Sequence, residues 1–156
     1  LKLNGIYLVR GRVVIPNGMK YSGQGVIIST GDIRVEGNFR KNSPTDGPCI
    51  LYTWTGDIHA NTVVPGRVEA SLVALRYNFD AAHSNSPRGA VRFSSRKADV
   101  LGNLVVDRLN LDTMSATQNN SVVYDADCLS GDDRYAQTLG GQLRRVTINY
   151  NAGEPL

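Results

Sequence analysis

The most informative segment for the fold is TGDIRVEGNF, residues 30–39, because the related segment TGDIHANTVV follows at residues 55–64. In both copies a Gly-Asp pair interrupts an apolar run, and a short segment with alternating apolar residues begins directly afterwards. Glycine and aspartate suit a sharp bend, since glycine adopts unusual backbone angles and the Asp side chain accepts backbone hydrogen bonds. A bend that returns with the same flanking pattern predicts successive coils of a solenoid.

Further segments share this pattern. The interpretation pairs KADVLGNLVV (residues 97–106) with the Gly-Asp copies as a weaker third member, and pairs GRVEASLVAL (66–75) with GNLVVDRLNL (102–111). Short apolar segments precede the bends: GVIIST (25–30), CILYTW (49–54), AVRFSS (90–95) and, with a related shape, GIYLVRGRVVI (5–15). One coil would take roughly 20 to 25 residues, which is a typical solenoid period.

The sequence therefore predicts an all-β protein, a parallel β-solenoid of about five to six coils with extruded loops. We expect one domain over residues 1–156, with repeating coils at about 5–111 and a non-repeating polar cover at 112–156 that includes the strand-like RRVTINYN (144–151). The extruded loops are expected after Phe39 and after Tyr77. A sandwich of hairpins is the alternative, with Asn17-Gly18 and Asp46-Gly47 as candidate hairpin turns.

Charge is distributed unevenly along the chain of 156 residues. Residues 1–97 carry 13 Lys and Arg against 6 Asp and Glu, whereas residues 98–156 carry 4 against 8. Neither a signal peptide nor an apolar run long enough to cross a bilayer is present, so we expect no membrane contact by this segment itself. The first residue is Leu1, and we interpret the chain as a domain of a longer protein.

The stretch YSGQGVIISTGDIRVEGN (residues 21–38), followed by GRVEASLVAL, resembles the β-solenoid repeats of bactofilin-type polymerising proteins. It resembles still more closely the solenoid domains of large type IV pilin-like proteins, including competence-associated minor pilins. The resemblance covers about residues 5–111. It implies an extracytoplasmic bacterial location, at the cell surface or in the periplasm, and other pilus or surface subunits as partners. Unlike the compact repeats of bactofilins, this chain has the two long insertions described above.

A set of basic residues is the candidate binding site. Arginine binds phosphate and carboxylate groups through paired hydrogen bonds, and aromatic residues lie near these positions in the sequence. The set predicts a stripe that binds a polyanion, either DNA or an acidic polysaccharide, with DNA favoured through the pilin-like resemblance. The alternative is an ordinary solvated surface. The candidates are Arg34, Arg40, Lys41, Arg76, Arg88, Arg92, Arg96 and Lys97, with Arg10, Arg12 and Arg67 on intervening outward positions.

Asp32, Asp57 and Asp99 are expected at equivalent bends, and stacking of the coils would place their carboxylates in a column. Such a column could bind a cation or supply general acids and bases. We favour a third reading, in which each Asp caps backbone N–H groups at its own bend. No cofactor or metal is therefore expected. Cys49 and Cys128 are either two thiols or one disulfide bond.

The two histidines do not indicate nucleophilic catalysis. His59 should point outward, His83 falls in a loop, and no Gly-x-Ser-x-Gly turn accompanies them. The sequence thus predicts a non-enzymatic, extracytoplasmic scaffold and binding domain of a pilus-like or cell-surface protein. Two alternatives stay open, a bactofilin-like cytoskeletal scaffold that polymerises through its ends and a carbohydrate-active β-helix enzyme.

Overall fold

Every strand pairing in the described part of the chain is parallel. The computed structural model describes residues 1–60, 62–75, 89–93, 98–110 and 121–123, and these contain strands and turns but no helix. Within these residues there is accordingly no helix that is long and apolar enough to cross a membrane. The predicted all-β parallel solenoid is confirmed.

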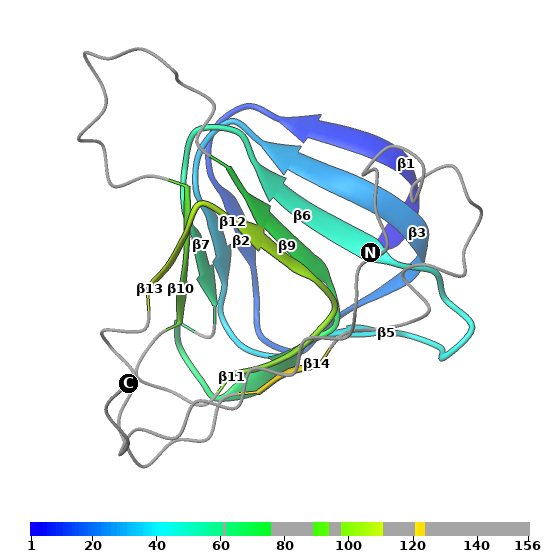
Figure 1. The fold of residues 1–156 in the computed structure, drawn as a ribbon. Helices are drawn as coiled ribbons and strands as arrows, with labels where there is room; N and C mark the ends of the chain where they lie inside the picture. Colours follow the sequence, from blue (N-terminus) through cyan, green and yellow to red (C-terminus); the bar gives the residue numbers. More distant parts are fainter. Residues whose placement is uncertain (61, 76–88, 94–97, 111–120, 124–156) are drawn as a thin grey trace, which may run out of the picture.

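The chain winds around three sheets that form the sides of a triangular prism (Figure 1). Sheet A contains β1 (Lys2–Val9), the second half of β3 (Met19–Ser29), β6 (Cys49–Thr53), β9 (Ser71–Ala74) and β12 (Leu104–Val106). Sheet B contains β2 (Val13–Ile15), β4 (Ile33–Val35), β7 (Ile58–Ala60), β10 (Ala90–Phe93) and β13 (Arg108–Asn110). Sheet C contains the first residues of β3, β5 (Phe39–Lys41), β8 (Gly66–Val68), β11 (Ala98–Leu101) and β14 (Ser121–Val123).

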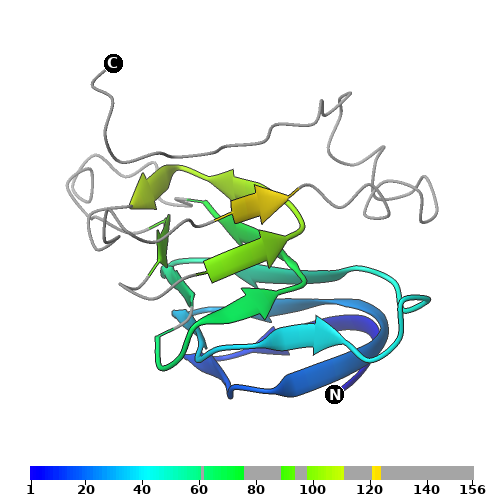
Figure 2. The ribbon, with the colours of Figure 1, turned by 90° about the horizontal axis from the view of Figure 1, so that it is seen from below.

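The turns follow one another along the solenoid axis, with β1 at one end (Figure 2). The chain makes about four turns, from β1 through β3, β6 and β9 to β12, and β13 and β14 continue the path. This is fewer than the five to six coils predicted, because the last of these turns is longer than expected: Leu104 pairs with Leu72, 32 residues earlier. β14 pairs with β11, so the solenoid continues past residue 111, where the sequence pattern ends. β1 likewise begins ahead of the expected first coil. The rest of the expected cover, including residues 144–151, lies outside the described residues, as does the expected loop after Tyr77.

The two Gly-Asp copies lie one above the other. Ile33 pairs with Ile58 in parallel register, and both side chains are fully buried. A hairpin would have placed the two strands antiparallel, so the hairpin sandwich is wrong for the described residues. At one proposed hairpin turn, Gly18 has φ of 81° and connects β2 in sheet B to β3, which begins in sheet C. The turn therefore rounds a corner of the prism.

Alternation along each short strand fills the core. In β4, β6 and β7 every second residue is buried, and the intervening residues face outward with partial exposure. Because the strands pair in parallel register, equivalent buried positions of successive turns lie one above another and form a column on each sheet. The columns are Ile33, Ile58 and Val91 on sheet B, Phe39 and Val68 on sheet C, and Ile27, Leu51 and Leu72 on sheet A. Full burial of each such side chain stabilises the fold by about 1.5–3 kcal/mol.

The corner between sheets A and B explains the Gly-Asp pair. The buried Thr53 hydroxyl donates to the Gly31 carbonyl one turn earlier (2.7 Å) and accepts from the Gly56 N–H (2.9 Å). A Cβ atom on Gly56 would lie 2.6 Å from the backbone nitrogen of Asp32, which is too close for any other residue. Consecutive turns therefore approach closely at this corner, and glycine permits the approach.

The weaker repeat copy belongs to another pair of faces. Ala98 pairs with Gly66, Val100 with Val68, and Leu104 with Leu72. Residues 98–106 thus repeat residues 66–74, across sheets C and A, and do not repeat the Gly-Asp corner. The predicted matching of residues 97–106 to the Gly-Asp copies, and of residues 102–111 to 66–75, is wrong. In each of these stretches a glycine or alanine is followed by alternating apolar residues. This pattern occurs at more than one corner of a three-sided coil, so it does not identify the corner.

The first insertion starts later than expected. Phe39 is fully buried in β5, where its ring centroid lies 5.0 Å from that of Tyr21. The loop itself occupies residues 42–48, between β5 in sheet C and β6 in sheet A. Asp46 closes this loop by accepting the Ser43 N–H (2.6 Å), and it accepts the Gly23 N–H (2.8 Å) from the neighbouring turn. The extruded segment is therefore tied to the body of the solenoid.

Candidate functional site

The predicted basic stripe divides between two faces. Arg34 and Arg92 lie on sheet B, on β4 and β10, whereas Arg40 and Lys41 lie on β5 in sheet C. Four further candidates lie outside the described residues: Arg76, Arg88, Arg96 and Lys97. Sheets B and C are different sides of the prism (Figure 1), so the described candidates do not form one continuous stripe.

On sheet B, the outward positions of three successive turns carry Arg34, His59 and Arg92. The register pairs Arg34 with His59 and His59 with Arg92. Each lies between two buried residues of its own strand, so each side chain points away from the core. His59 therefore faces outward as predicted. Adjacent turns are about 4.8 Å apart, which makes this a regular column along the axis.

A groove of about 460 Å³ lies beside this column and is lined by Arg12, Asp32, Arg34, His59 and Thr62. The Arg34 Nε–H donates to the Thr62 hydroxyl (2.7 Å), and Arg34 Nε lies 4.0 Å from a carboxylate oxygen of Glu36. The Arg34 side chain is 43% exposed. The terminal nitrogens of Arg34 make no hydrogen bond to any residue that the structure describes. The contact with Thr62 thus orients the guanidinium and leaves its terminal N–H groups available for a ligand.

Asp32 and Asp57 stack as predicted, and their carboxylates cap the following turn. The Asp57 N–H donates to Asp32 Oδ1 (3.0 Å), and the Ala90 N–H donates to Asp57 Oδ1 (3.0 Å). The other oxygen of Asp57 accepts the Nε–H of Arg92 at 2.8 Å. Backbone capping is therefore confirmed, with one correction: these caps reach the next coil, whereas the sequence interpretation placed them within their own bend.

Asp99 does not belong to this column. It lies on β11 in sheet C, where its register partner is Arg67, whereas Asp32 and Asp57 precede strands of sheet B. The position one turn beyond Asp57 is occupied by Ala90. The three-carboxylate column was wrong because it rested on the incorrect third repeat copy. Among the described residues, no group of three or more His, Cys, Asp or Glu side chains is placed to hold a metal ion.

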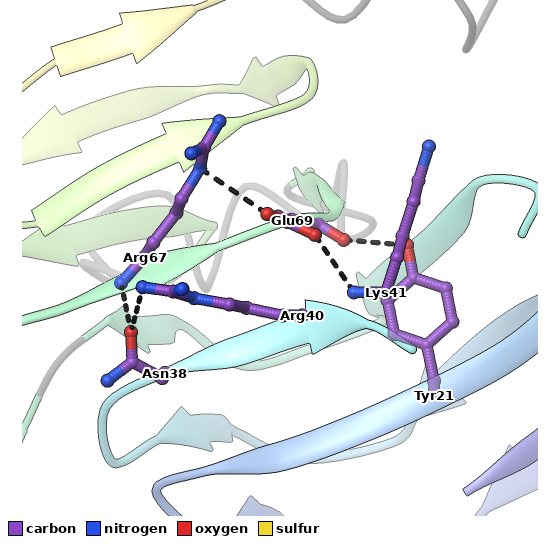
Figure 3. Close-up of polar contacts among 6 residues, drawn as sticks. All are labelled: Tyr21, Asn38, Arg40, Lys41, Arg67 and Glu69. Atoms are coloured by element: carbon purple, nitrogen blue, oxygen red, sulfur yellow. Dashed lines mark hydrogen bonds and ion pairs between the residues drawn. The ribbon is translucent and has the colours of Figure 1, made fainter. Parts of the chain in front are cut away.

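On sheet C, the basic residues take part in a polar network that joins three turns (Figure 3). Glu69 Oε2 accepts the backbone N–H of Lys41 (2.9 Å), and its Oε1 lies 3.4 Å from the Nε of Arg67. The backbone carbonyl of Glu69 accepts the hydroxyl of Tyr21 (2.8 Å), whose side chain is buried. Glu69 therefore bonds its own turn to the preceding turn, through the N–H of Lys41, and to the turn before that one, through the hydroxyl of Tyr21.

Asn38 completes this network at the corner that leads into sheet C (Figure 3). Its side-chain oxygen accepts the backbone N–H of Arg67 (3.0 Å) and an Nη2–H of Arg40 (2.9 Å). Its own N–H donates to the side-chain oxygen of Asn17 one turn earlier (2.9 Å). The side chains of Asn38 and Glu69 thus hold neighbouring turns together, and those of Arg40 and Arg67 are engaged with them. This makes sheet C a structural face and leaves the groove on sheet B as the candidate site.

Sequence reasoning missed two kinds of residue. Thr62 lines the groove from the bend after β7, and no periodic pattern places a bend residue beside an outward strand position. Arg12 was expected on an outward strand position, whereas it lines the groove from the bend before β2. Tyr21 and Glu69 have partners one and two turns away, so their roles depend on the register. A signal did exist for Asn17 and Asn38, since each follows or precedes a glycine at the bend into sheet C.

Cys49 is the first residue of β6 and is fully buried. Its proposed partner, Cys128, lies outside the described residues. The two alternatives, two thiols or one disulfide bond, are therefore not tested by the described residues.

Comparisons with protein-family models, with curated proteins and with solved structures give no match for this chain. The similarity to bactofilin-type and pilin-like solenoids therefore rests on the sequence motifs alone.

Proposed function

We propose that this chain is a rigid, non-enzymatic scaffold domain that binds a polyanion along sheet B. In this proposal it works outside the bacterial cytoplasm as part of a pilus-like or surface protein, with other subunits of that assembly as partners. The observation that carries the binding proposal is the groove where Arg12, Arg34 and His59 converge from successive turns. The location is supported by the resemblance to pilin-like solenoids.

The spacing of the basic groups favours a polymer. Arg34, His59 and Arg92 repeat once per turn, so an extended anionic chain that runs along the axis meets a basic side chain about every 4.8 Å. Arginine holds carboxylate and phosphate groups by directed hydrogen bonds as well as by charge. Arg92 already pairs with Asp57, so Arg34 and Arg12 would supply most of the attraction.

Binding is better supported than catalysis. A glycosidase needs two carboxyl groups free to face the substrate. Asp32 and Asp57 are the stacked carboxylates of the described part of the chain, and both accept backbone N–H groups of the next turn. Asp57 also pairs with Arg92 and is only 8% exposed. These contacts suit a structural role for the Asp pair.

The test is equilibrium binding of fluorescent polyanions to the purified chain, using duplex DNA and polygalacturonate at about 50 mM salt and upward. We expect binding that weakens steeply as salt rises, because bound counterions are released on association. Arg34→Ala should weaken it, while Arg67→Ala, which removes the same side chain from sheet C, should leave it nearly unchanged. Absence of binding at about 50 mM salt, or equal loss in both variants, would refute the proposal.

A second candidate is polymerisation through the solenoid end. β1 pairs with β3 along one edge and with no other strand of the described residues. It exposes Ile6 (68%) and Leu8 (58%) at this end, and Val14 of β2 is 49% exposed. A long apolar edge strand is a template for pairing with another chain. Filaments seen by electron microscopy, and lost in an Ile6→Lys, Leu8→Lys double variant, would favour this candidate; monomers at high concentration would exclude it.

A further inference from the structure

The sheet B groove contains one acidic side chain among its basic ones. Asp32 lines it together with Arg12, Arg34 and His59. Asp32 Oδ1 accepts the N–H of Asp57, whereas Oδ2 makes no hydrogen bond or ion pair to a residue that the structure describes. Arg12 and Asp32 form no ion pair with each other. The groove therefore presents an available acceptor next to available cationic donors.

This combination restricts the ligand. The Arg12 and Arg34 guanidinium groups attract an anion and donate hydrogen bonds, and Oδ2 of Asp32 repels an anion and accepts a hydrogen bond. The Thr62 hydroxyl accepts from Arg34 and still has its own proton to donate. A fitting ligand carries a negative group and a hydroxyl donor side by side.

The two polyanion classes differ in this respect. A uronic acid sugar has a carboxylate and several hydroxyl groups on one ring, so it satisfies the arginines and Asp32 together. The DNA backbone has phosphates and no hydroxyl groups along its length, so a phosphate seated at Arg34 meets Asp32 without a compensating hydrogen bond. Placing like charges together in an interface costs binding free energy, so the Asp32 carboxylate should disfavour DNA.

We propose that the groove selects an acidic, hydroxyl-bearing polysaccharide over DNA, with carboxylates at Arg12 and Arg34 and sugar hydroxyls at Asp32 and Thr62. This inference rests on the proposed polyanion-binding function and names the class of polymer. A volume of about 460 Å³ is within the usual range for sites that bind small organic groups, which suits a short stretch of sugar rings.

The experiment compares polygalacturonate and duplex DNA on the same chain at equal charge concentration and about 50 mM salt. Neutral dextran, at the same mass concentration as polygalacturonate, is the uncharged control. Charge density alone favours DNA, whose phosphates are closely spaced. We expect the opposite order, with polygalacturonate bound at least about tenfold more tightly than DNA, roughly the effect of one charge-assisted hydrogen bond, and dextran bound weakly.

Asp32→Asn is the diagnostic variant, since its amide oxygen can still accept the Asp57 N–H. It should raise DNA affinity about three- to tenfold by removing one repulsive charge, without a matching gain for polygalacturonate. A thermal melt close to that of the parent chain shows that the variant is folded. The comparison on the parent chain tests the inference even if the variant does not fold.

The failures are distinguishable. If DNA binds as tightly as polygalacturonate and Arg34→Ala weakens both, the choice of polymer is wrong and the polyanion function stands. If dextran binds as well as polygalacturonate, the groove does not recognise charge and the inference fails. If none of the three polymers binds, the proposed function fails and this inference fails with it.

Discussion

The backbone N–H of Asp57 donates a hydrogen bond of 3.0 Å to Oδ1 of Asp32, the residue at the same corner one turn earlier. Hydroxyl groups at this corner reach the other way, since Thr53 donates to the carbonyl of Gly31 in the preceding turn. Each turn is thus bonded through side chains to both of its neighbours. In a structure of this kind the stability of one turn depends on its interfaces with the next.

Replacement of Asp57 by alanine should destabilise the protein by about 2 kcal/mol or more, because it leaves the buried N–H of Ala90 without its acceptor and removes the partner of Arg92. Asp57→Asn keeps an oxygen for Ala90 and should lose about half as much. Urea denaturation gives both values. Glu36→Ala, which breaks only a partly exposed contact at 4.0 Å, is the control and should change stability by under about 1 kcal/mol. Equal effects of the three substitutions would contradict the capping role.

Gly56→Ala should be strongly destabilising, by about 2 kcal/mol or more, since the added carbon would lie 2.6 Å from backbone atoms of Gly31 and Asp32. Gly31→Ala is the matched comparison, because its nearest neighbours are at 3.1 Å and a small shift relieves the contact. The melting temperature of the Gly56→Ala variant should therefore be lower than that of the Gly31→Ala variant. The reverse order would mean that the turns are not packed more tightly around Gly56 than around Gly31.

Tyr21→Phe should cost about 1 kcal/mol, because it removes the 2.8 Å hydrogen bond to the carbonyl of Glu69 and keeps the ring that packs against Phe39. Tyr21→Ala removes the buried ring as well and should cost about 3–5 kcal/mol. Denaturant titrations measure the two changes. A Tyr21→Phe variant as stable as the parent chain would show that the bond between these turns contributes nothing net.

The loop at residues 42–48 should make stability depend on acid pH. The N–H of Gly23, the largest cause, and the N–H of Ser43 bond to Asp46 and lower its pKa below the ordinary 3.8. A depressed pKa means that the contribution is complete above the unfolded-state value and is lost as pH falls through the folded-state value. The stability difference between the parent chain and Asp46→Asn should therefore be constant near neutral pH and shrink below about pH 4. A difference unchanged down to about pH 2 would contradict this assignment.

The parallel solenoid could be predicted from the Gly-Asp copies because the bend residues and the apolar alternation at these positions are those that the fold requires. Glycine at the bend, an apolar residue at each inward position and the same order in the next turn are all visible at residues 30–39 and 55–64. The third copy was misplaced because a three-sided coil has three bends, and residues 97–106 resemble more than one of them. Register, which the pairing of Ala98 with Gly66 shows, separates the alternatives.

The site was predicted only in part. Arg34, Arg92 and His59 could be assigned outward positions from alternation along their strands. The sequence could not show that Arg34 and Arg92 share a column while Arg40 belongs to a different face, because that depends on how many residues each corner contains. It also could not show that Asp32 stands beside Arg34 in a groove.

The parallel coiling of this chain and the inward-facing side chains could be worked out from the amino-acid order, since both follow from local bends and from alternation along strands. Which residues meet across turns became known only from the folded structure. The Tyr21 hydroxyl meets the backbone carbonyl of Glu69, and Arg12 and Asp32 line one groove, because stacking brings residues one or two turns apart side by side. That spacing varies with each corner, so no local pattern encodes it.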